Sequence, residues 1–183
     1  MAILSRATRI LRCCALAGSL LAAVADGQQN AEEYQVKAAF LYNFAKFVEW
    51  PSEAFKSATD PIVICVLGQN PFDHALDEAV AGKKVAGRSI VTREIAAGKH
   101  ASSCQILFIS VSERKRWRAI LDGVKGCYIL TVGESEEFTS SGGVVSLEVE
   151  EGKVRFQINA DAAKQSKLRI SSKLLSLAQM ARK

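Results

Sequence analysis

Three uninterrupted apolar runs constrain the fold of this chain most strongly. They are Ile62–Leu67, Gln105–Ser110 and Cys127–Val132, and each is rich in branched or large apolar side chains. A strand that is buried on both faces needs such a continuous run, whereas a half-exposed strand alternates apolar and polar residues. The three runs therefore predict a parallel sheet that helices cover on both sides.

Helical patterns occupy the segments around these runs. An apolar stripe over residues 31–49 predicts a long first helix, which Trp50-Pro51 ends because proline disfavours helical backbone at the residue before it. Further helices are expected over residues 72–80, 113–124, 134–141 and 162–165 and after Ser171 or Ser172, with Ser112 and Asp161 as candidate N-caps.

Alternating segments predict strands of a second kind. Residues 88–95 alternate as a more exposed strand, and residues 144–150 and 153–159 alternate on either side of Glu151-Gly152. Two period-2 runs around a tight turn indicate an antiparallel hairpin with one wet face. The predicted fold class is a three-layer α/β domain with a largely parallel buried sheet, an antiparallel C-terminal hairpin and helices at both ends.

The first 25 residues have the form of a secretory signal peptide. Three arginines precede the apolar segment Cys13–Val24, and Ala23-Val24-Ala25 has the small-x-small form that a signal peptidase accepts. Twelve apolar residues rise only about 18 Å as a helix, which is too short for a stable membrane anchor. A lipoprotein signal is disfavoured because Arg12 directly precedes Cys13. We expect cleavage before Asp26, which leaves residues 26–183 as one domain outside the cytoplasm.

Charge and composition exclude several classes of function. The net charge of +5 becomes +2 once the three arginines of residues 1–25 are removed, so the basic balance is no argument for nucleic-acid binding, which would need a clustered basic face. His74 and His100 stand far apart and lack a metal-ligand spacing. No glycine fingerprint or nucleophile elbow is present. The sequence predicts a protein that is not an enzyme and carries no metal or cofactor.

Three cysteines remain after the expected cleavage: Cys65, Cys104 and Cys127. Cys65 lies inside the first buried run and Cys104 directly before the next one, so neighbouring strands would bring the two within reach of a disulfide. Closing a loop of about 40 residues contributes roughly 4 kcal/mol in the chain-entropy account. The alternative is three buried thiols.

Several segments together resemble the YfiR family. They are the opening helix QVKAAFLYNFAKFVEWP (35–51), ICVLGQNPF (64–72), CQILFISVSE (104–113), ILTVGE (129–134) and VRFQINADAAKQSKLRISSKLLSLA (154–178). These segments extend in order over nearly all of residues 26–183. Any one of them is a weak signal, whereas the set is specific.

The resemblance implies a periplasmic repressor. Such a protein binds the periplasmic part of an inner-membrane diguanylate cyclase, YfiN, and lowers cyclic-di-GMP, while an outer-membrane-associated partner, YfiB, sequesters it. The resemblance also implies a homodimer and one family disulfide at Cys65 and Cys104. A second family disulfide has no counterpart here because Cys127 stands alone, which puts redox control through a second bridge in doubt.

Three residues are candidates for contact with a partner or ligand. Phe47 and Trp50 end an aromatic-rich helix, and aromatic side chains often anchor interfaces. Arg169, directly before the last helix, could hold an anionic ligand or a partner carboxylate. Core packing competes for the aromatic stripe and favours Phe40 and Phe44 as buried, and Arg169 could equally be a solvated arginine. An alternative to the repressor is a periplasmic module that senses a small ligand and acts on a membrane receptor.

Overall fold

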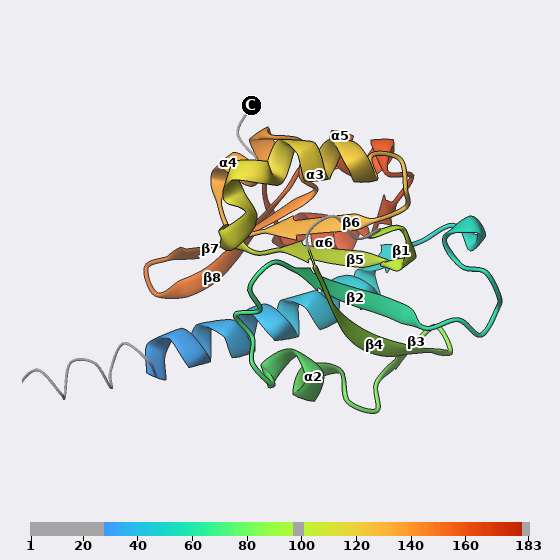
Figure 1. Ribbon diagram of the computed structural model, residues 1–183, viewed down its shortest axis with the longest axis horizontal. Coiled ribbons are helices and arrows are strands. Elements are labelled where there is room, and N and C mark those ends of the chain that lie inside the picture. Colours follow the sequence, from blue (N-terminus) through green and yellow to red (C-terminus); the bar gives the residue numbers. More distant parts are fainter. Residues whose placement is uncertain (1–27, 97–100, 181–183) are drawn as a thin grey trace, which may run out of the picture.

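An eight-stranded sheet runs through the computed structural model, which describes residues 28–96 and 101–180 (Figure 1). The strand order is β10-β8-β7-β6-β5-β2-β4-β3, and the run from β7 to β4 is parallel. The strands of this sheet are β2 (Ile62–Leu67), β3 (Lys84–Val85), β4 (Arg88–Ile95), β5 (Ile106–Ile109), β6 (Leu130–Gly133), β7 (Val145–Glu150), β8 (Lys153–Ile158) and β10 (Gln179–Met180). The predicted fold class is therefore confirmed.

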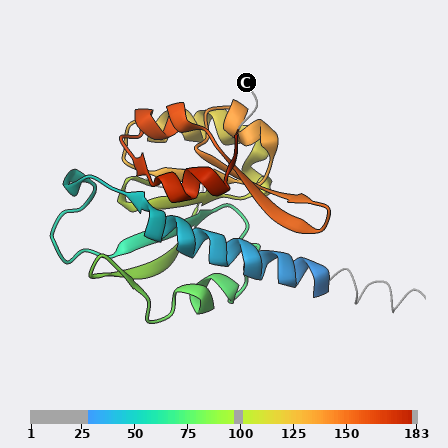
Figure 2. The same cartoon turned by 180° about the vertical axis from the view of Figure 1, so that it is seen from behind.

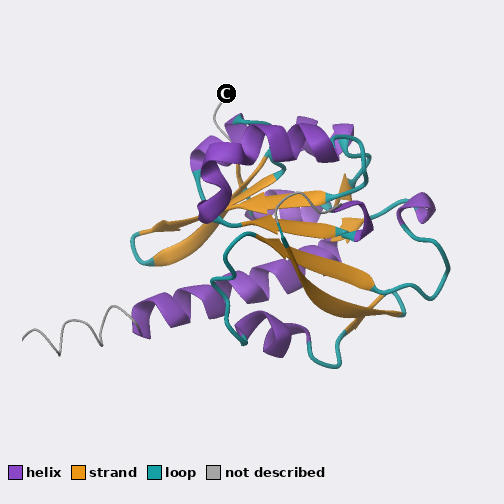
Figure 3. Ribbon diagram, viewed as in Figure 1, coloured by secondary structure: helices purple, strands orange, loops and turns teal. Residues whose placement is uncertain are grey.

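Helices cover both faces of the sheet. The N-terminal helix (residues 28–47), α2 (Ala75–Val80) and α6 (Ser172–Leu177) lie on one face, as Figure 2 shows, and α3 (Trp117–Val124) lies on the other (Figure 3). The remaining helices are α4 (Glu136–Ser140), α5 (Ala160–Gln165) and the 3-10 segments η1 (Ser52–Ala54), η2 (Ala101–Ser103) and η3 (Val111–Arg116).

Successive residues of β2 divide the core into two clusters. Ile64 packs in the larger cluster with Leu41 and Phe44 of the N-terminal helix, whereas its neighbour Cys65 packs in a second cluster with Trp117 of α3. Side chains alternate between the two faces along a strand, so a strand buried on both faces is apolar at every position. All six residues of β2 are buried, as its unbroken apolar run predicts.

The predicted hairpin is present between β7 and β8. Glu150 pairs with Lys153 and Val149 with Val154, which leaves Glu151 and Gly152 as a two-residue turn. Both turn residues have positive φ, 51° and 72°. Two positive φ values in succession are the geometry of a type I′ turn, which matches the twist of the flanking strands.

The first helix differs from its predicted bounds. It spans residues 28–47 rather than 31–49, and Val48–Glu49 forms the short strand β1. Pro51 disfavours helical backbone just before it, and β1 gains a strand partner near the C-terminus, so extended backbone is favoured over a further helical turn.

Two predicted helix caps are wrong and one is confirmed. Ser110, not Ser112, caps the helical segment that follows β5, and its side chain accepts the backbone N–H of Ser112. Asn159, not Asp161, caps α5. Ser171 caps α6, as one of its two predicted positions. Both errors displace the cap because each helical segment begins earlier than its apolar pattern indicates.

The bounds of two further elements differ from those predicted from the sequence. The predicted helix 113–124 is divided into the 3-10 segment η3 and the α-helix α3. The predicted strand 127–132 begins only at Leu130, because Tyr128 has a φ of 59°, in the left-handed region that strands exclude. Cys127 therefore lies in a half-buried bend before the strand and not within it.

Candidate functional site

A two-stranded ribbon joins the end of the N-terminal helix to the segment before the last helix. β1 (Val48–Glu49) pairs antiparallel with β9 (Arg169–Ile170), which places Glu49 opposite Arg169. The backbone N–H of Ser171 donates to the carbonyl of Phe47 at 3.0 Å and extends the pairing. Segments about 120 residues apart in sequence are thereby fixed side by side.

Arg169 and Glu49 form an exposed ion pair on this ribbon. The Arg169 Nε lies 3.9 Å from Glu49 Oε2, and their side chains are 87% and 74% exposed. An exposed pair at this distance contributes little to stability because water and salt screen it. Both charged groups are therefore available to a partner at small cost.

Phe47 is half-buried and packs against the larger core cluster. Two lysine ammonium groups lie over its ring: Lys173 Nζ is 5.3 Å from the ring centroid and Lys46 Nζ is 5.6 Å from it. Cations near an aromatic face are attracted to its negative potential. Phe47 thus packs against the core and also contacts the ammonium groups of two lysines.

Trp50 is also half-buried, and its indole is anchored. Its Nε1 donates to the carbonyl of Gln105 at 3.2 Å. Gln105 is itself buried, accepts the backbone N–H of Val63 at 2.8 Å and donates to the carbonyl of Ala54 at 2.9 Å. The indole orientation is thus fixed by the backbone carbonyl of a buried residue just before β5.

The three residues singled out from the sequence therefore lie on one short ribbon and its flanks. Together with Glu49 and Lys173, they make up what we call the ribbon surface: Phe47, Glu49, Trp50, Arg169 and Lys173. Sequence reasoning missed Glu49 because it falls inside the predicted helix. It missed Lys173 because nothing in the sequence indicates that α6 lies beside Phe47.

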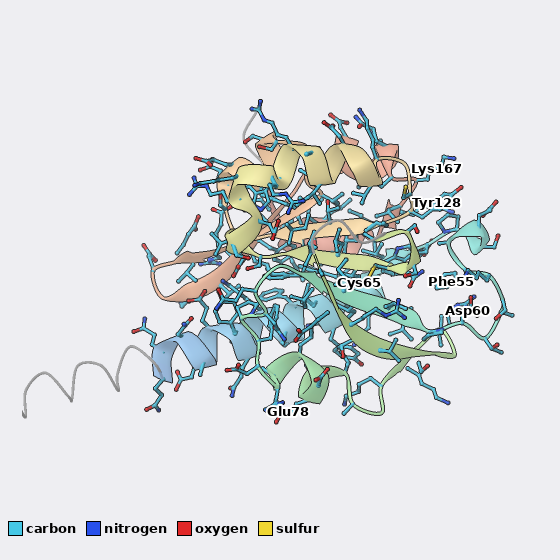
Figure 4. The ribbon with its side chains drawn as sticks, viewed as in Figure 1. Phe55, Asp60, Cys65, Glu78, Tyr128 and Lys167 are labelled. Atoms are coloured by element: carbon cyan, nitrogen blue, oxygen red, sulfur yellow. A yellow bond between two sulfur atoms is a disulfide. The ribbon has the colours of Figure 1, made fainter. Side chains whose placement is uncertain are left out.

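The same end of the molecule carries further cation–aromatic contacts. Figure 4 shows Lys167 next to Tyr128, with its Nζ 5.3 Å from the ring centroid. The Arg88 guanidinium lies 3.7 Å from the centroid of Phe55 and donates to the carbonyl of Asp60 at 2.7 Å. These contacts lie at the same end of the molecule as β1 (Figure 4).

The loop that carries Asp60 is held by hydrogen bonds to its carboxylate. The Ser57 hydroxyl donates to Oδ1 at 2.6 Å, and the backbone N–H of Lys56 donates to Oδ2 at 2.8 Å. These two donors, the hydroxyl first, lower the pKa of Asp60 below its ordinary value. The carboxylate is therefore charged at neutral pH and acts as a structural acceptor within its own loop.

Among the described residues, we find no group of side chains arranged as a catalytic site. His74 is exposed before α2, and His100 lies outside the described residues. Across residues 28–96 and 101–180, no three His, Cys, Asp or Glu side chains gather as a metal site would require. No helix in the described part of the chain is long and apolar enough to cross a membrane.

The predicted disulfide is present. Cys65 of β2 and Cys104, just before β5, are bonded with their Cα atoms 5.8 Å apart. Both are buried in the second core cluster, beneath Trp117 and Leu121. Cys127 is a free thiol among the described cysteines. The bridge fixes β2 to the start of β5, next to Gln105, whose backbone carbonyl anchors Trp50.

A comparison with protein-family models shows to which family the chain belongs. The sequence model described as YfiR/HmsC-like, DUF4154, matches residues 34–179. The chain belongs to the YfiR/HmsC-like family. Members of this family are periplasmic and regulatory, they act in cyclic-di-GMP signalling, and they are not catalysts. The match includes all five residues of the ribbon surface.

Other comparisons add only fold information. No curated protein matches the sequence. A conserved domain protein from Vibrio cholerae O1 biovar El Tor is 15% identical, with a TM-score of 0.50 over 66% of this chain and 54% of that one. An ABC domain in complex with L-Trp from Streptococcus pneumonia is 11% identical, with a TM-score of 0.48 over 65% of this chain and 54% of that one. The YfiR/HmsC-like chain thus spans about half the length of either structure.

Proposed function

We propose that this YfiR-like protein represses a membrane diguanylate cyclase by binding the periplasmic domain of that enzyme through the ribbon surface. Family membership supplies the signalling context. The observation that carries the proposal is the convergence of Phe47, Trp50 and Arg169 on one ribbon, although they come from opposite ends of the sequence. A repressor needs a shaped, charged surface and no reaction centre, which fits the absence of a catalytic assembly in the described residues.

The ribbon surface has the composition that interface centres favour. Aromatic and arginine side chains are over-represented among residues that dominate binding energy. Here Phe47 and Trp50 are held by the core and by Gln105, so little side-chain entropy is lost when a partner covers them. Arg169 offers a planar guanidinium that pairs well with a carboxylate of the partner.

Compartment and assembly follow from the same proposal. Removal of residues 1–25 would release the domain into the periplasm, where it meets the outer face of the cyclase. A YfiB-like protein of the outer membrane would compete for the repressor, and the repressor would act as a homodimer.

Deletion of this gene tests the proposal in a strain that expresses the cyclase. Cyclic-di-GMP is measured in the wild type, in the deletion strain and in the deletion strain that carries the gene on a plasmid. We expect the nucleotide to rise on deletion and to return to the wild-type level on complementation. Unchanged cyclic-di-GMP after deletion would refute repression.

A further inference from the structure

A second surface, far from the ribbon surface, is strongly basic. It is a hollow of about 530 Å³ between η3, the start of α3 and α4, which we call the basic hollow. This volume lies within the range of small-molecule sites, roughly 300–1,000 Å³. The side chains that line it are Arg114, Lys115, Trp117, Arg118, Glu137 and Ser141.

Three cations in this hollow come from five consecutive residues. Arg114, Lys115 and Arg118 are all exposed. Arg114 is engaged by Glu137, whose Oε2 lies 2.5 Å from the Arg114 Nη2. The side chains of Lys115 and Arg118 have no hydrogen bond or ion pair to another described residue. Two cationic groups are therefore free to bind an anion, and a third is occupied by a single carboxylate.

Trp117 supplies an independent indication of a ligand. The residue is only 3% exposed, it lines the basic hollow, and its Nε1 has no acceptor among the described residues. Its ring packs edge-on against Phe138, with 5.3 Å between the centroids, which holds the indole in place. A buried indole N–H normally has a partner. The other tryptophan, Trp50, has one in the carbonyl of Gln105.

We propose that the basic hollow binds the phosphate group of an organic phosphate. Lys115, Arg118 and the Trp117 indole N–H are its donors, and Glu137 competes with the phosphate for Arg114. A phosphate monoester offers three acceptor oxygens and a charge near −2 at neutral pH. A carboxylate offers two oxygens and a single charge, so it could do no more than replace Glu137. The number of donors therefore favours phosphate.

The position of the basic hollow agrees with ligand binding. η3 follows β5 and α4 follows β6, so the hollow lies at the carboxyl ends of parallel strands, where open α/β sheets most often bind ligands. The ribbon surface lies at the opposite end of the sheet, as β1 and α4 show in Figure 1. The basic hollow and the ribbon surface are therefore two separate surfaces of the molecule.

The two tryptophans make the test direct. A ¹⁵N-labelled sample of the purified protein gives two indole N–H signals, which a Trp50→Phe variant assigns. Titration with glycerol 3-phosphate should shift the Trp117 signal downfield, because its N–H gains an acceptor, and leave the Trp50 signal in place. Vesicles of phosphatidic acid in phosphatidylcholine, whose anionic headgroup is a phosphate monoester, are tested in parallel by co-sedimentation.

Side-chain variants identify the donors. Arg118→Ala should weaken binding about tenfold, the loss of one charge-assisted hydrogen bond, whereas Arg155→Ala on β8 should leave it unchanged. Glu137→Gln should strengthen binding, because it removes the competing carboxylate. The neighbouring Glu136→Gln provides the matched control.

Each outcome of the test decides something. A shift with glycerol 3-phosphate assigns a soluble ligand, and vesicle binding alone assigns a lipid headgroup. Either result supports the phosphate site provided that Arg118→Ala weakens it. Absence of binding to both probes would overturn the proposal. Binding that Arg118→Ala and Arg155→Ala reduce equally would overturn it as well.

Discussion

Lys37 of the N-terminal helix donates to Glu134, 97 residues away, across a distance of 2.6 Å between its Nζ and the carboxylate Oε1. Both side chains are almost fully buried, 4% and 7% exposed. Lys37 also pairs with Glu33 one helical turn earlier, and its ammonium lies 4.6 Å from the centroid of the Tyr34 ring. This pair fixes the helix to the end of β6, so the helix that leads into the ribbon surface has one position on the sheet.

Replacement of Lys37 by methionine should destabilise the protein by about 3 kcal/mol. Breaking a buried ion pair from one side leaves the other charge without compensation, and that cost exceeds the value of the pair itself. Urea denaturation, monitored by circular dichroism, gives the change in the free energy of unfolding.

Two further variants test whether the loss of stability comes from the buried ion pair. Lys46→Met, at an exposed lysine on the same helix, should change stability by less than about 0.5 kcal/mol. Adding Glu134→Gln to Lys37→Met should recover a large part of the loss, because no buried charge then remains unpaired. If Lys37→Met were as mild as Lys46→Met, the pair would have no structural importance.

The environment of Tyr34 predicts that the stability of the folded protein falls at alkaline pH. Burial raises the pKa of its phenol well above the ordinary value, and the negative charge of Glu134 raises it further. Above about pH 10 the unfolded chain loses this proton while the folded protein retains it, so stability falls as pH rises. Comparing urea midpoints at pH 8 and pH 11 should show a smaller fall for Tyr34→Phe than for the wild type. Tyr42→Phe, on the same helix, is the control, and equal falls in wild type and Tyr34→Phe would contradict the assignment.

The sheet was predictable because burial on both faces leaves a direct record in the sequence. Ile62–Leu67 is apolar at every position, and the alternation around Glu151-Gly152 records one wet face. Helix starts were less accurate, since Ser110 and Asn159 cap segments whose first turns carry little apolar pattern. Local periodicity identifies the middle of an element better than its end.

The ribbon surface was only partly accessible to sequence reasoning. Phe47, Trp50 and Arg169 were candidates for separate reasons, but nothing local indicates that they meet. β1 and β9 are two residues long, so their pairing depends on how the N-terminal helix and α6 pack rather than on strand propensity. Long-range pairing of this kind requires the tertiary structure.

Replacement of glycine by alanine should have opposite effects on stability at two positions. A Cβ on Gly143 would overlap the ring of Phe138, which is fully buried and held against Trp117. Gly143→Ala should therefore cost roughly 1–3 kcal/mol through overpacking. Gly123 lies in α3 with open space around it, so Gly123→Ala should stabilise the protein by about 0.5–1 kcal/mol. Thermal unfolding compares the two, and a harmless Gly143→Ala would show that Phe138 can move.

The disulfide should contribute more to stability than any surface interaction. Replacing Cys65 and Cys104 together by alanine removes a bridge between residues 39 apart in sequence, at a cost of roughly 2–4 kcal/mol. Cys127→Ser alters a half-buried free thiol and should cost little. Urea denaturation of both variants provides the comparison. An equal loss in the two would mean that the bridge does not constrain the native chain.

The most direct test of the proposed repression reverses the charge of Arg169. Arg169 is 87% exposed, and its ion pair with Glu49 is weak, so Arg169→Glu should leave folding and export intact. Cyclic-di-GMP is measured in the deletion strain complemented with the wild-type gene, with Arg169→Glu or with Arg155→Glu as the matched control on β8. Our account predicts that the wild type and Arg155→Glu restore repression, whereas Arg169→Glu leaves cyclic-di-GMP at the level of the deletion strain. Full repression by a correctly exported Arg169→Glu protein would contradict it.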